Sequence, residues 1–551
     1  MLKSGAEIVV EALISHGVGN VFGYPGGAVL DLYDALYRNS DRINHYIACH
    51  EQGAAHAADG YARATGKVGV VIATSGPGAT NLVTGIATAY LDSVPMVAIT
   101  GNVALPLIGK DSFQEVDITG ITMPITKHNY IVKNVNDLEE TIYEAFQVAA
   151  SGRPGPVLID IPKDVQAQTC EFKGGNPLPL FPLEQTCEEK LTQIAEIINS
   201  ANRPYIYCGG GVVIANASEE LAEFAKKIDA PIGCSMMGLS AVSSSNPLML
   251  GMTGMHGTYA ASKMRGDADV IIGIGVRFSD RATGDKVAYQ ENTKIIHIDI
   301  DDAEIDKNIP ATCSVLGDIK SIIPQLIKLV KSNKHEEWNK LAQEYKSVAN
   351  KKFQDGFNPR NIIKTVGKFA KPDTIVATDV GQHQMWTAQY YEFERPRTFL
   401  TSGGLGTMGF GVGAANGASI AHNKAKTVLF TGDGSFHMNM NEVATAVRHK
   451  LPIIIMLMNN SVLGMVRQWQ GLFYEGRYSQ TTLNRPTNYV KLAEAFGAVG
   501  YNASNQTELE AALQMAFDSD QPVIINCIIN SDEKVLPMIP PGKAVSDMIV
   551  D

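Results

Sequence analysis

Two oxygen-bearing side chains, Asp433 and Asn460, carry the clearest chemical signal in this sequence. Asp433 lies in a Gly-Asp-Gly turn after the apolar run 427–431, and Asn460 lies in an Asn-Asn turn after the apolar run 453–458. Mg²⁺ takes a carboxylate, an amide or carbonyl oxygen and phosphate oxygens as ligands, and the flanking glycines let the backbone come close to phosphates. The two turns therefore predict a site for Mg²⁺ and a diphosphate.

The chain between these turns predicts the elements that position them. Val443, Val447 and Leu451 recur at helical spacing, and Asn439 with Glu442 is predicted to cap the start of that helix. The stretch is a predicted strand, helix and strand. A right-handed crossover then places both strand ends on one edge of a parallel sheet, where open α/β sheets bind ligands.

Either turn alone is more often an ordinary strand end. Together, at a separation of 27 residues (433 to 460), they resemble the signature of thiamine diphosphate (ThDP) enzymes. A literal GxGxxG at 404–409 suggests a Rossmann dehydrogenase instead. That alternative is weaker, because the next predicted strand ends in the Gly-Asp-Gly turn, whose aspartate is better explained as a metal ligand.

Composition limits the class of protein. The 551 residues are 45% hydrophobic and 19% charged, which is typical of a globular protein of three or four domains. A net charge of −11 without a long basic run argues against nucleic acid as a partner. The sequence contains no apolar run of 18 or more residues, so no membrane-spanning helix is predicted.

The cysteines and the N-terminus indicate a cytoplasmic protein. Seven scattered cysteines without a CxxC pair predict neither a disulfide framework nor a zinc site. The sequence Ser4-x-x-Glu7 is a capping box that opens an amphipathic helix rather than a signal or transit peptide.

The order of apolar and helical segments predicts three doubly wound α/β domains with parallel sheets. Residues 1–165 form the first domain, 190–335 the second and 360–551 the third. The segment 165–190 is rich in proline and glycine and is predicted to be a linker, and 331–357 is predicted to be a charged, helical linker.

Several motifs together resemble one family. These are YPGG at 24–27, HEQGAAHAADGYAR at 50–63, TSGPGATN at 74–81, SGRPGPVLIDIPKD at 151–164, GDGSF at 432–436 and NN at 459–460. The chain resembles the catalytic subunit of acetohydroxyacid synthase (acetolactate synthase) nearly from end to end. The resemblance implies a pyrimidine-binding first domain, an FAD-binding central domain and a diphosphate-binding third domain.

The resemblance also implies an activity. Pyruvate would be decarboxylated on ThDP, and the hydroxyethyl carbanion would add to a second pyruvate to give 2-acetolactate or to 2-oxobutyrate to give 2-aceto-2-hydroxybutyrate. Mg²⁺ would anchor the ThDP, and FAD would be structural. A homodimer would be the smallest active unit, with a homotetramer and a small regulatory subunit as further possibilities.

The family assigns roles to residues that match its motifs. Glu51 would hydrogen-bond the aminopyrimidine ring of ThDP and relay a proton. Arg281 would pair with the keto acid's carboxylate, and Trp469 would select the second substrate, although a core or interface tryptophan is the alternative for Trp469. The other residues assigned to substrate or catalysis are Gly27, Gln114 and Lys163.

The remaining assignments concern cofactors. The backbone carbonyl of Val462 would be the third Mg²⁺ ligand, and Met438 would support the bent ThDP, unless it is a core methionine. Further ThDP residues would be Tyr24, Pro25, Gly26, Gly76, Val380, Gly381, Gln382, His383, Gly406, Met408, Gly434, Ser435 and Met465. FAD residues would be Arg153, Gly209, Gly210, Met255, His256, Gly257, Gly275, Arg277, Asp299, Ile300, Gly317 and Asp318.

Two departures from the family pattern and two alternative functions remain. Ala104-Leu105-Pro106 stands where many members have Pro-Arg-Arg, and Ser279 replaces an aspartate of the family's FDDR motif. A flavin-using ThDP pyruvate oxidase would share the fold, but segments 110–115 and 465–469 resemble the synthase. A scaffold without catalysis would be expected to have lost Glu51, Asp433 or Asn460, and all three are present.

Overall fold

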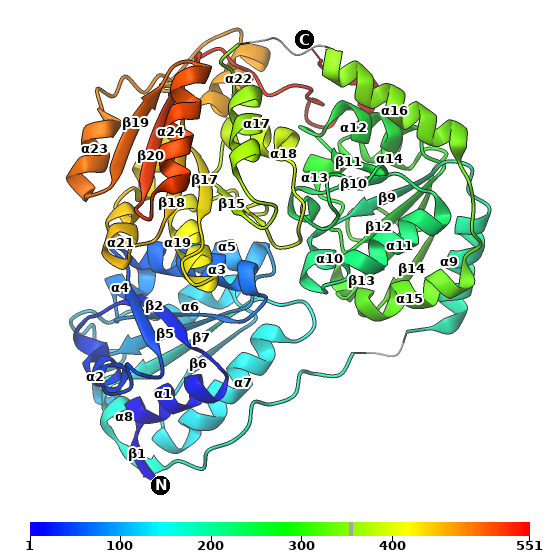
Figure 1. The fold of residues 1–551 in the computed structure, drawn as a ribbon. Coiled ribbons are helices and arrows are strands. Elements are labelled where there is room, and N and C mark those ends of the chain that lie inside the picture. The colour runs from blue at the N-terminus through cyan, green and yellow to red at the C-terminus, as the bar shows by residue number, and fades with distance from the viewer. Residues whose placement is uncertain (184–185, 352–355, 551) are drawn as a thin grey trace.

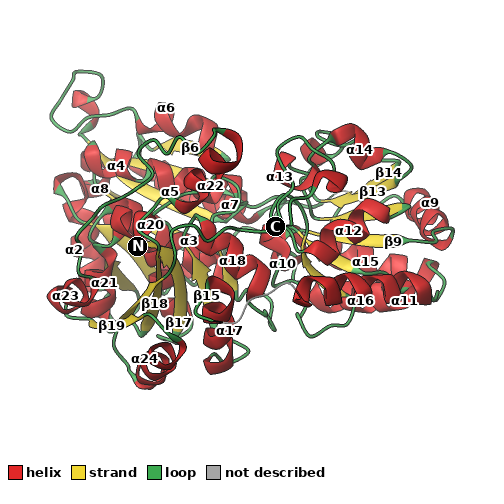
Figure 2. Cartoon of the chain, turned by 90° about the horizontal axis from the view of Figure 1, so that it is seen from above, coloured by secondary structure: helices red, strands yellow, loops and turns green. Residues whose placement is uncertain are grey.

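The computed structural model describes residues 1–183, 186–351 and 356–550, without the side chains of 349–351. It contains three six-stranded sheets, each built of parallel strands and flanked by helices, and one small antiparallel pair. Figures 1 and 2 show three α/β units, so the predicted fold class is confirmed. No helix within the described ranges combines the length and the apolar character that crossing a bilayer requires.

The N-terminal unit has the strand order β3-β2-β4-β5-β7-β6. Its capping box is present, because Ser4 Oγ accepts from Glu7 N while the Glu7 side chain accepts from Ser4 N. The strands of this unit are β1 (Leu2–Ser4), β2 (Asn20–Tyr24), β3 (Asn44–Ile47), β4 (Gly69–Ala73), β5 (Met96–Asn102), β6 (His128–Ile131), β7 (Pro156–Pro162) and β8 (Thr169–Glu171). The helices are α1 (Gly5–Ser15), α2 (Leu30–Arg38), α3 (Glu51–Thr65), α4 (Pro77–Asn81), α5 (Val83–Leu91), α6 (Ile118–Thr122), α7 (Leu138–Ala150) and α8 (Lys163–Ala167).

The central unit has the order β11-β10-β9-β12-β13-β14. Its strands are β9 (Pro204–Cys208), β10 (Ile232–Cys234), β11 (Met249–Met252), β12 (Val270–Ile274), β13 (Lys294–Asp299) and β14 (Cys313–Leu316). Its helices are α9 (Glu188–Asn199), α10 (Gly210–Ile214), α11 (Ser218–Ile228), α12 (Tyr259–Asp267), α13 (Asp280–Thr283), α14 (Lys286–Gln290), α15 (Ile319–Leu329) and α16 (Glu336–Lys351).

The C-terminal unit has the order β16-β15-β17-β18-β20-β19. Its strands are β15 (Ile375–Thr378), β16 (Phe399–Leu400), β17 (Thr427–Gly432), β18 (Ile453–Asn459), β19 (Val499–Ala503) and β20 (Val523–Ile528). Its helices are α17 (Pro359–Phe369), α18 (Gln382–Tyr390), α19 (Gly411–Ala421), α20 (Asp433–Asn439), α21 (Glu442–His449), α22 (Gly464–Phe473), α23 (Tyr489–Phe496) and α24 (Gln506–Asp518).

The N-terminal and C-terminal units pack through α3 and α19, which lie against each other in Figure 1. Small residues make this close approach possible. A Cβ at Gly60 would collide with the backbone of Ala414, and one at Gly417 would collide with the carbonyl of Ala57. The buried interface therefore fixes the orientation of α3, the helix that begins at Glu51.

Two segments outside the sheets pack against the central unit. Helix α16 falls in the predicted second linker, yet Trp338 is buried and its Nε1 donates to Pro204 O at 2.9 Å. The chain after β20 leaves the C-terminal sheet and reaches the central unit, where Ile539 N donates to Met255 O at 2.8 Å. The segment after β20 thus ties the C-terminal unit to the central unit.

The predicted cap of the helix after Asp433 is wrong. Two helices occupy this stretch, and Asn439 ends the first of them, α20. Glu442 begins α21, but its carboxylate accepts from the backbone N–H groups of Cys49 and His50 in the N-terminal unit. The Glu442 side chain therefore accepts hydrogen bonds from the backbone just before α3, and it does not cap its own helix.

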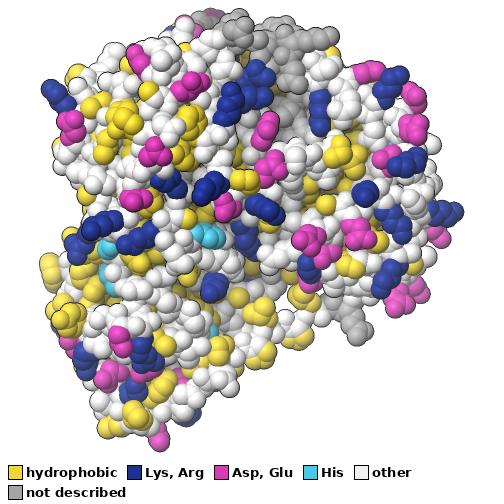
Figure 3. All heavy atoms as spheres, viewed as in Figure 1, with side chains coloured by type: hydrophobic (Ala, Val, Ile, Leu, Met, Phe, Trp, Pro, Cys, Tyr) yellow, Lys and Arg dark blue, Asp and Glu magenta, His cyan; other side chains and the backbone are white. Residues whose placement is uncertain are grey.

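Charged side chains of both signs are interspersed over the face shown in Figure 3. Hydrophobic side chains lie between them in small groups.

Candidate active site

The predicted metal ligands follow neighbouring strands. Strands β17 and β18 pair in parallel with Gly432 opposite Met458, so Asp433 and Asn460 leave the same edge of the sheet. Asp433 is buried, and its Oδ1 has no hydrogen-bond partner among the described residues. Burial raises the pKa of Asp433 to about 6. An unpaired buried carboxylate oxygen is costly, and a divalent cation would compensate that cost.

The second ligand belongs to a hydrogen-bonded chain of amides. Asn460 Oδ1 accepts from Val462 N at 3.3 Å, and Asn460 Nδ2 donates to Gln382 Oε1 at 3.1 Å. Gln382 Nε2 in turn donates to Gln468 Oε1 at 3.1 Å. A Cβ at Gly464 would collide with the Gln382 side chain, so this glycine lets α22 start directly beside the amide chain.

The loop after β15 forms a second wall of the site. Gly381 has φ of 149°, a value that favours glycine. His383 lies against Gly432, and burial lowers its pKa to about 3, so its imidazole is neutral near pH 7. Ser435 Oγ donates to Val380 O at 2.9 Å, which joins this loop to the start of α20 beside Asp433.

Asp379 is a site residue that the sequence reasoning missed. It lies one residue past the end of β15, and its carboxylate accepts from Gly409 N at 2.7 Å and from Thr431 Oγ1 at 3.2 Å. It thereby joins the loop that contains Gly406 and Met408 to the end of β17. Burial raises the pKa of Asp379 to about 6. The sequence signal that could have identified Asp379 was its position directly after an apolar strand.

Helix α22 and the central unit meet at the predicted substrate residues. The Arg281 guanidinium lies 5.6 Å from the centre of the Trp469 ring. Arg281 Nη1 also lies 3.7 Å from Met255 Sδ. Trp469 packs edge-on against Phe473 at 5.6 Å between ring centroids, and its Nε1 is buried without a partner among the described residues. The structure therefore brings together a cation and a large apolar ring from different units.

The other residues predicted in this unit lie on helices α20 and α22. Met465 is partly buried on α22, and Gly434 is buried in α20. Met438 has 57% of its surface exposed, so within one chain it is not a core residue.

The N-terminal residues gather at the ends of β2 and β4. Glu51 is buried at the start of α3, where its Oε2 accepts from Asn81 Nδ2 at 2.9 Å and its Oε1 faces Gly78. A Cβ at Gly26 would collide with Thr74, and one at Gly76 would press against Gln114. Gly27 opens the turn that follows, and Tyr24 and Pro25 precede it. Asn81 was missed as the partner of Glu51, although it ends the TSGPGATN motif.

Glu51 lies in the N-terminal unit and the predicted metal ligands lie in the C-terminal unit. Among the described residues, Glu51 hydrogen-bonds only within the N-terminal unit, and no hydrogen bond or ion pair links it to Asp433 or Asn460.

The predicted flavin residues cluster at the carboxyl ends of the central strands. A Cβ at Gly209 would collide with the carbonyl of Gly275, and Gly275 has φ of 58°, so both positions require glycine. His256 Nε2 is buried without a partner among the described residues, and burial lowers the pKa of His256 to about 4. Gly210 begins α10, and Gly257 N donates to Gly254 O at 2.9 Å.

A cavity of about 240 Å³ lies beside this cluster. It is lined by Arg153, Pro182, Leu183, Ile300, Asp301, Asp302, Leu316 and Gly317. The Arg153 guanidinium forms ion pairs with Asp301 at 3.0 Å and Glu304 at 2.7 Å. Acidic groups at strand ends can accept hydrogen bonds from ribose hydroxyl groups. The cavity therefore offers carboxylates and backbone groups at the ends of β13 and β14.

Three other predicted residues have contacts of their own, and a fourth, Lys163, is exposed. Arg277 Nη1 donates to Leu91 O of the N-terminal unit at 2.6 Å. Asp318 caps α15 by accepting from Lys320 N, and the carboxylate of Asp299 accepts from Asp301 N. Lys163 is exposed at the start of α8.

Comparisons with known proteins agree with this arrangement. Three models of thiamine pyrophosphate enzymes match the chain: the N-terminal TPP binding domain over residues 3–121, the central domain over 191–326 and the C-terminal TPP binding domain over 379–527. Thiamine pyrophosphate is another name for ThDP.

Curated relatives match over almost their whole length. The acetolactate synthase isozyme 2 large subunit of Escherichia coli (strain K12) is 44% identical, with 99% of each chain covered. The acetolactate synthase large subunits of Haemophilus influenzae and of Buchnera aphidicola from Schizaphis graminum are 44% and 43% identical, covering 99% of this chain and 98% of each relative. The chain belongs to the acetolactate synthase large-subunit family. The predicted family is thereby confirmed, and a pyruvate oxidase is not favoured.

In this acetolactate synthase large subunit, the side chains at the edge of the C-terminal sheet suit the binding of ThDP. The loops after β15, β17 and β18 supply a neutral histidine, an unpaired carboxylate oxygen and a chain of amides around one sheet edge. Among the described residues, no group of three or more His, Cys, Asp or Glu side chains could hold a metal. A cation here would instead take one carboxylate together with amide, carbonyl and phosphate oxygens.

Proposed function

We propose that this protein is an acetolactate synthase that joins two 2-keto acids with loss of CO2. The match to acetolactate synthase large subunits over 99% of the chain carries the proposal. ThDP, when bound, supplies an electron sink for the carbon that loses CO2. The protein's part is to bind the cofactor, move a proton at its ring, orient the keto acids and exclude water.

We assign Mg²⁺ to Asp433, Asn460 and the backbone carbonyl of Val462. The unpaired Oδ1 of Asp433 supports this assignment, as does the parallel pairing that places both turns on one edge. The cation would neutralise the diphosphate charge and hold it against the glycine turn.

Glu51 moves the proton in this proposal. Its carboxyl group is buried and held by Asn81, so it is positioned to exchange a proton between Oε1 and a ring nitrogen of the cofactor. Its hydrogen bonds lie in the N-terminal unit, whereas the metal ligands lie in the C-terminal unit. Together with the two-subunit site that the family resemblance implies, this separation supports two copies of the chain, in a homodimer or homotetramer, for each site.

The second substrate is proposed to bind between Arg281 and Trp469. The guanidinium would pair with its carboxylate, and the indole ring 5.6 Å away would contact its alkyl group. A ring at this place can favour 2-oxobutyrate over pyruvate through the extra methylene.

FAD is proposed as a structural cofactor of the central unit. The glycine contact between Gly209 and Gly275 and the cavity beside Ile300 and Gly317 support this assignment. The large-subunit names of the relatives also support a small regulatory subunit as a partner.

The test is an assay of acetolactate formation by purified protein from which ThDP, Mg²⁺ or FAD has been omitted in turn. Omission of ThDP or Mg²⁺ should abolish the product, and the protein should carry the yellow absorbance of bound flavin. Full activity without ThDP would refute the proposed function, and activity without any flavin would refute the FAD assignment alone.

A further inference from the structure

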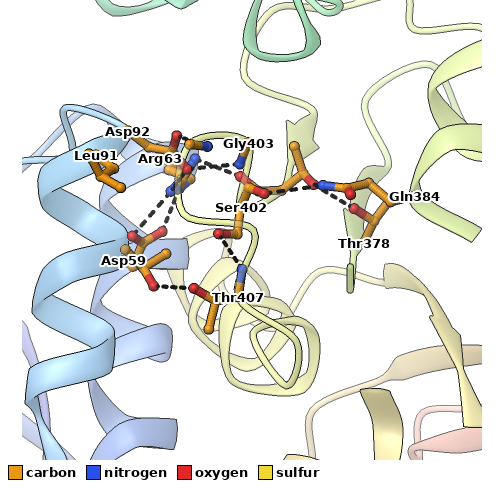
Figure 4. A network of polar contacts seen from close by, with 12 residues as sticks. Asp59, Arg63, Leu91, Asp92, Thr378, Gln384, Ser402, Gly403 and Thr407 are labelled. Carbon is orange, nitrogen blue, oxygen red and sulfur yellow. Dashed lines mark hydrogen bonds and ion pairs between the residues drawn. The ribbon is translucent and has the colours of Figure 1, made fainter. Parts of the chain in front are cut away.

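Helix α3 carries a second set of buried polar residues at the end opposite to Glu51. The Arg63 guanidinium pairs with Asp59 on the same helix and with Asp92 Oδ2 at 2.9 Å (Figure 4). Its Nη1 also donates to Thr401 O of the C-terminal unit at 2.9 Å. The side chains of Asp59 and Asp92 are fully buried, and that of Arg63 is 8% exposed.

Asp92 holds the chain that follows Thr401. Its carboxylate accepts from Gly403 N at 3.0 Å and from Gly404 N at 2.7 Å. Nearby, the hydroxyl groups of Thr88 and Thr407 lie 2.7 Å apart. Residues of the N-terminal unit thus hydrogen-bond both ends of the segment 403–407. We call Arg63, Asp92 and Thr88 the loop clamp.

The segment that the loop clamp holds contains Gly406 and precedes Met408, both predicted to contact ThDP. We call this segment, 403–407, the ThDP loop. Residues 403–406 are exposed, although the residues on either side are buried. On the far side, Gly409 N donates to Asp379 and Gly409 O accepts from Asn439 Nδ2 at 2.9 Å. Fixed ends with an exposed middle suit a loop that must present its backbone, including Gly406, to a ligand.

Stability alone gives a poor reason for such a clamp. Two carboxylates and one guanidinium leave water here, and buried ion pairs are often no more stabilising than apolar residues of the same volume. Their benefit is geometric, because a carboxylate that accepts two successive backbone N–H groups fixes both the position and the direction of a loop.

We propose that Arg63 and Asp92 are positioning residues that hold the ThDP loop of their own chain. This inference rests on the proposed function, in which Glu51 at the other end of α3 acts on the cofactor of the second chain. Glu51 and Arg63 are 12 positions apart on one helix, or about 18 Å along its axis. One helix of each chain therefore serves both active sites of a dimer.

The first test measures ThDP affinity in the presence of Mg²⁺ by titration calorimetry. Asp92→Asn should raise the Kd by about 10- to 100-fold, since an amide cannot accept both N–H groups and also pair with Arg63. Asp269→Asn is the matched control, because Asp269 also accepts from two successive backbone N–H groups, of Asn202 and Arg203, far from the loop.

The control variant should lose some thermal stability while keeping the wild-type Kd. Equal Kd values for Asp92→Asn and wild type would overturn the clamp. If Asp92→Asn does not fold, Thr88→Val removes the hydroxyl contact at the other end of the loop and should weaken ThDP binding in the same way. An unchanged Kd in that variant would also overturn it.

The second test mixes two impaired chains, one carrying Glu51→Gln and one carrying Asp92→Asn, at limiting ThDP. In a mixed dimer, both defects fall in one site and the other site is intact. Random reassociation makes about half of the dimers mixed, so about one quarter of wild-type activity should return.

The outcomes distinguish failure of the loop clamp from failure of the proposed function. No recovery, with both variants impaired alone, would place Glu51 and the clamp at different sites from those proposed and overturn the inference. Wild-type activity of Glu51→Gln by itself would instead refute the role of Glu51 in the proposed function.

Discussion

Replacing Glu51 by glutamine tests the proton transfer with little change of shape. The buried carboxylate accepts from Asn81 Nδ2 at 2.9 Å, and the amide oxygen of glutamine can keep that bond. The amide cannot give or take a proton, so catalysis should fall while the fold and ThDP binding persist. Loss of a positioned acid or base costs about 10²- to 10⁴-fold in rate, or about 3 to 5 kcal/mol in barrier.

The assay follows exchange of the ThDP C2 proton for deuterium by quenched-flow NMR. Glu508→Gln is the control, because Glu508 is an exposed carboxylate in the first turn of α24 that accepts from Ser504 N, far from the site. A second variant, Asn81→Leu, removes the hydrogen bond to Glu51 and should slow exchange by about 10- to 100-fold. Wild-type exchange in Glu51→Gln would refute the reasoning.

Three further changes have definite expected outcomes. Asp433→Ala should abolish Mg²⁺-dependent ThDP binding, and an unchanged Kd would show that the metal binds elsewhere. Trp469→Leu should reduce the preference for 2-oxobutyrate over pyruvate, by at most the ~1–3 kcal/mol that one methylene contributes; an unchanged product ratio in a competition assay would contradict this. Burial raises the pKa of Asp160 from 3.8 to about 7. The folded protein then keeps a proton that the unfolded chain loses, and stability should fall by up to about 4 kcal/mol as pH rises from 4 to 7. Asp160→Asn should remove this dependence, so the melting temperature of the variant should rise relative to that of the wild type between pH 5.5 and 8. A difference in melting temperature that stays constant over this range would refute the prediction.

Local patterns predicted the elements that hold the chemistry. The apolar runs before Asp433 and Asn460 became adjacent parallel strands. In each case the side-chain pattern lies within a few residues of the feature that it predicts. The metal ligands could therefore be proposed from local patterns, whereas the role of Glu51 rested on the family resemblance.

Contacts between distant segments could not be predicted in this way. Glu442 was expected to cap its own helix, but it binds backbone N–H groups of residues 49 and 50. Asp92 and Gly404 are 312 positions apart, and no local pattern relates them. In α16, Trp338 and Ala342 are buried one turn apart inside a charged run that was predicted to be a linker.

Conversion of ¹³C-labelled pyruvate by the purified protein with ThDP and Mg²⁺ tests the central claim most directly. NMR should show one 2-acetolactate and one CO2 for every two pyruvate molecules consumed. Acetate or acetyl phosphate with hydrogen peroxide, one for each pyruvate, would contradict the account.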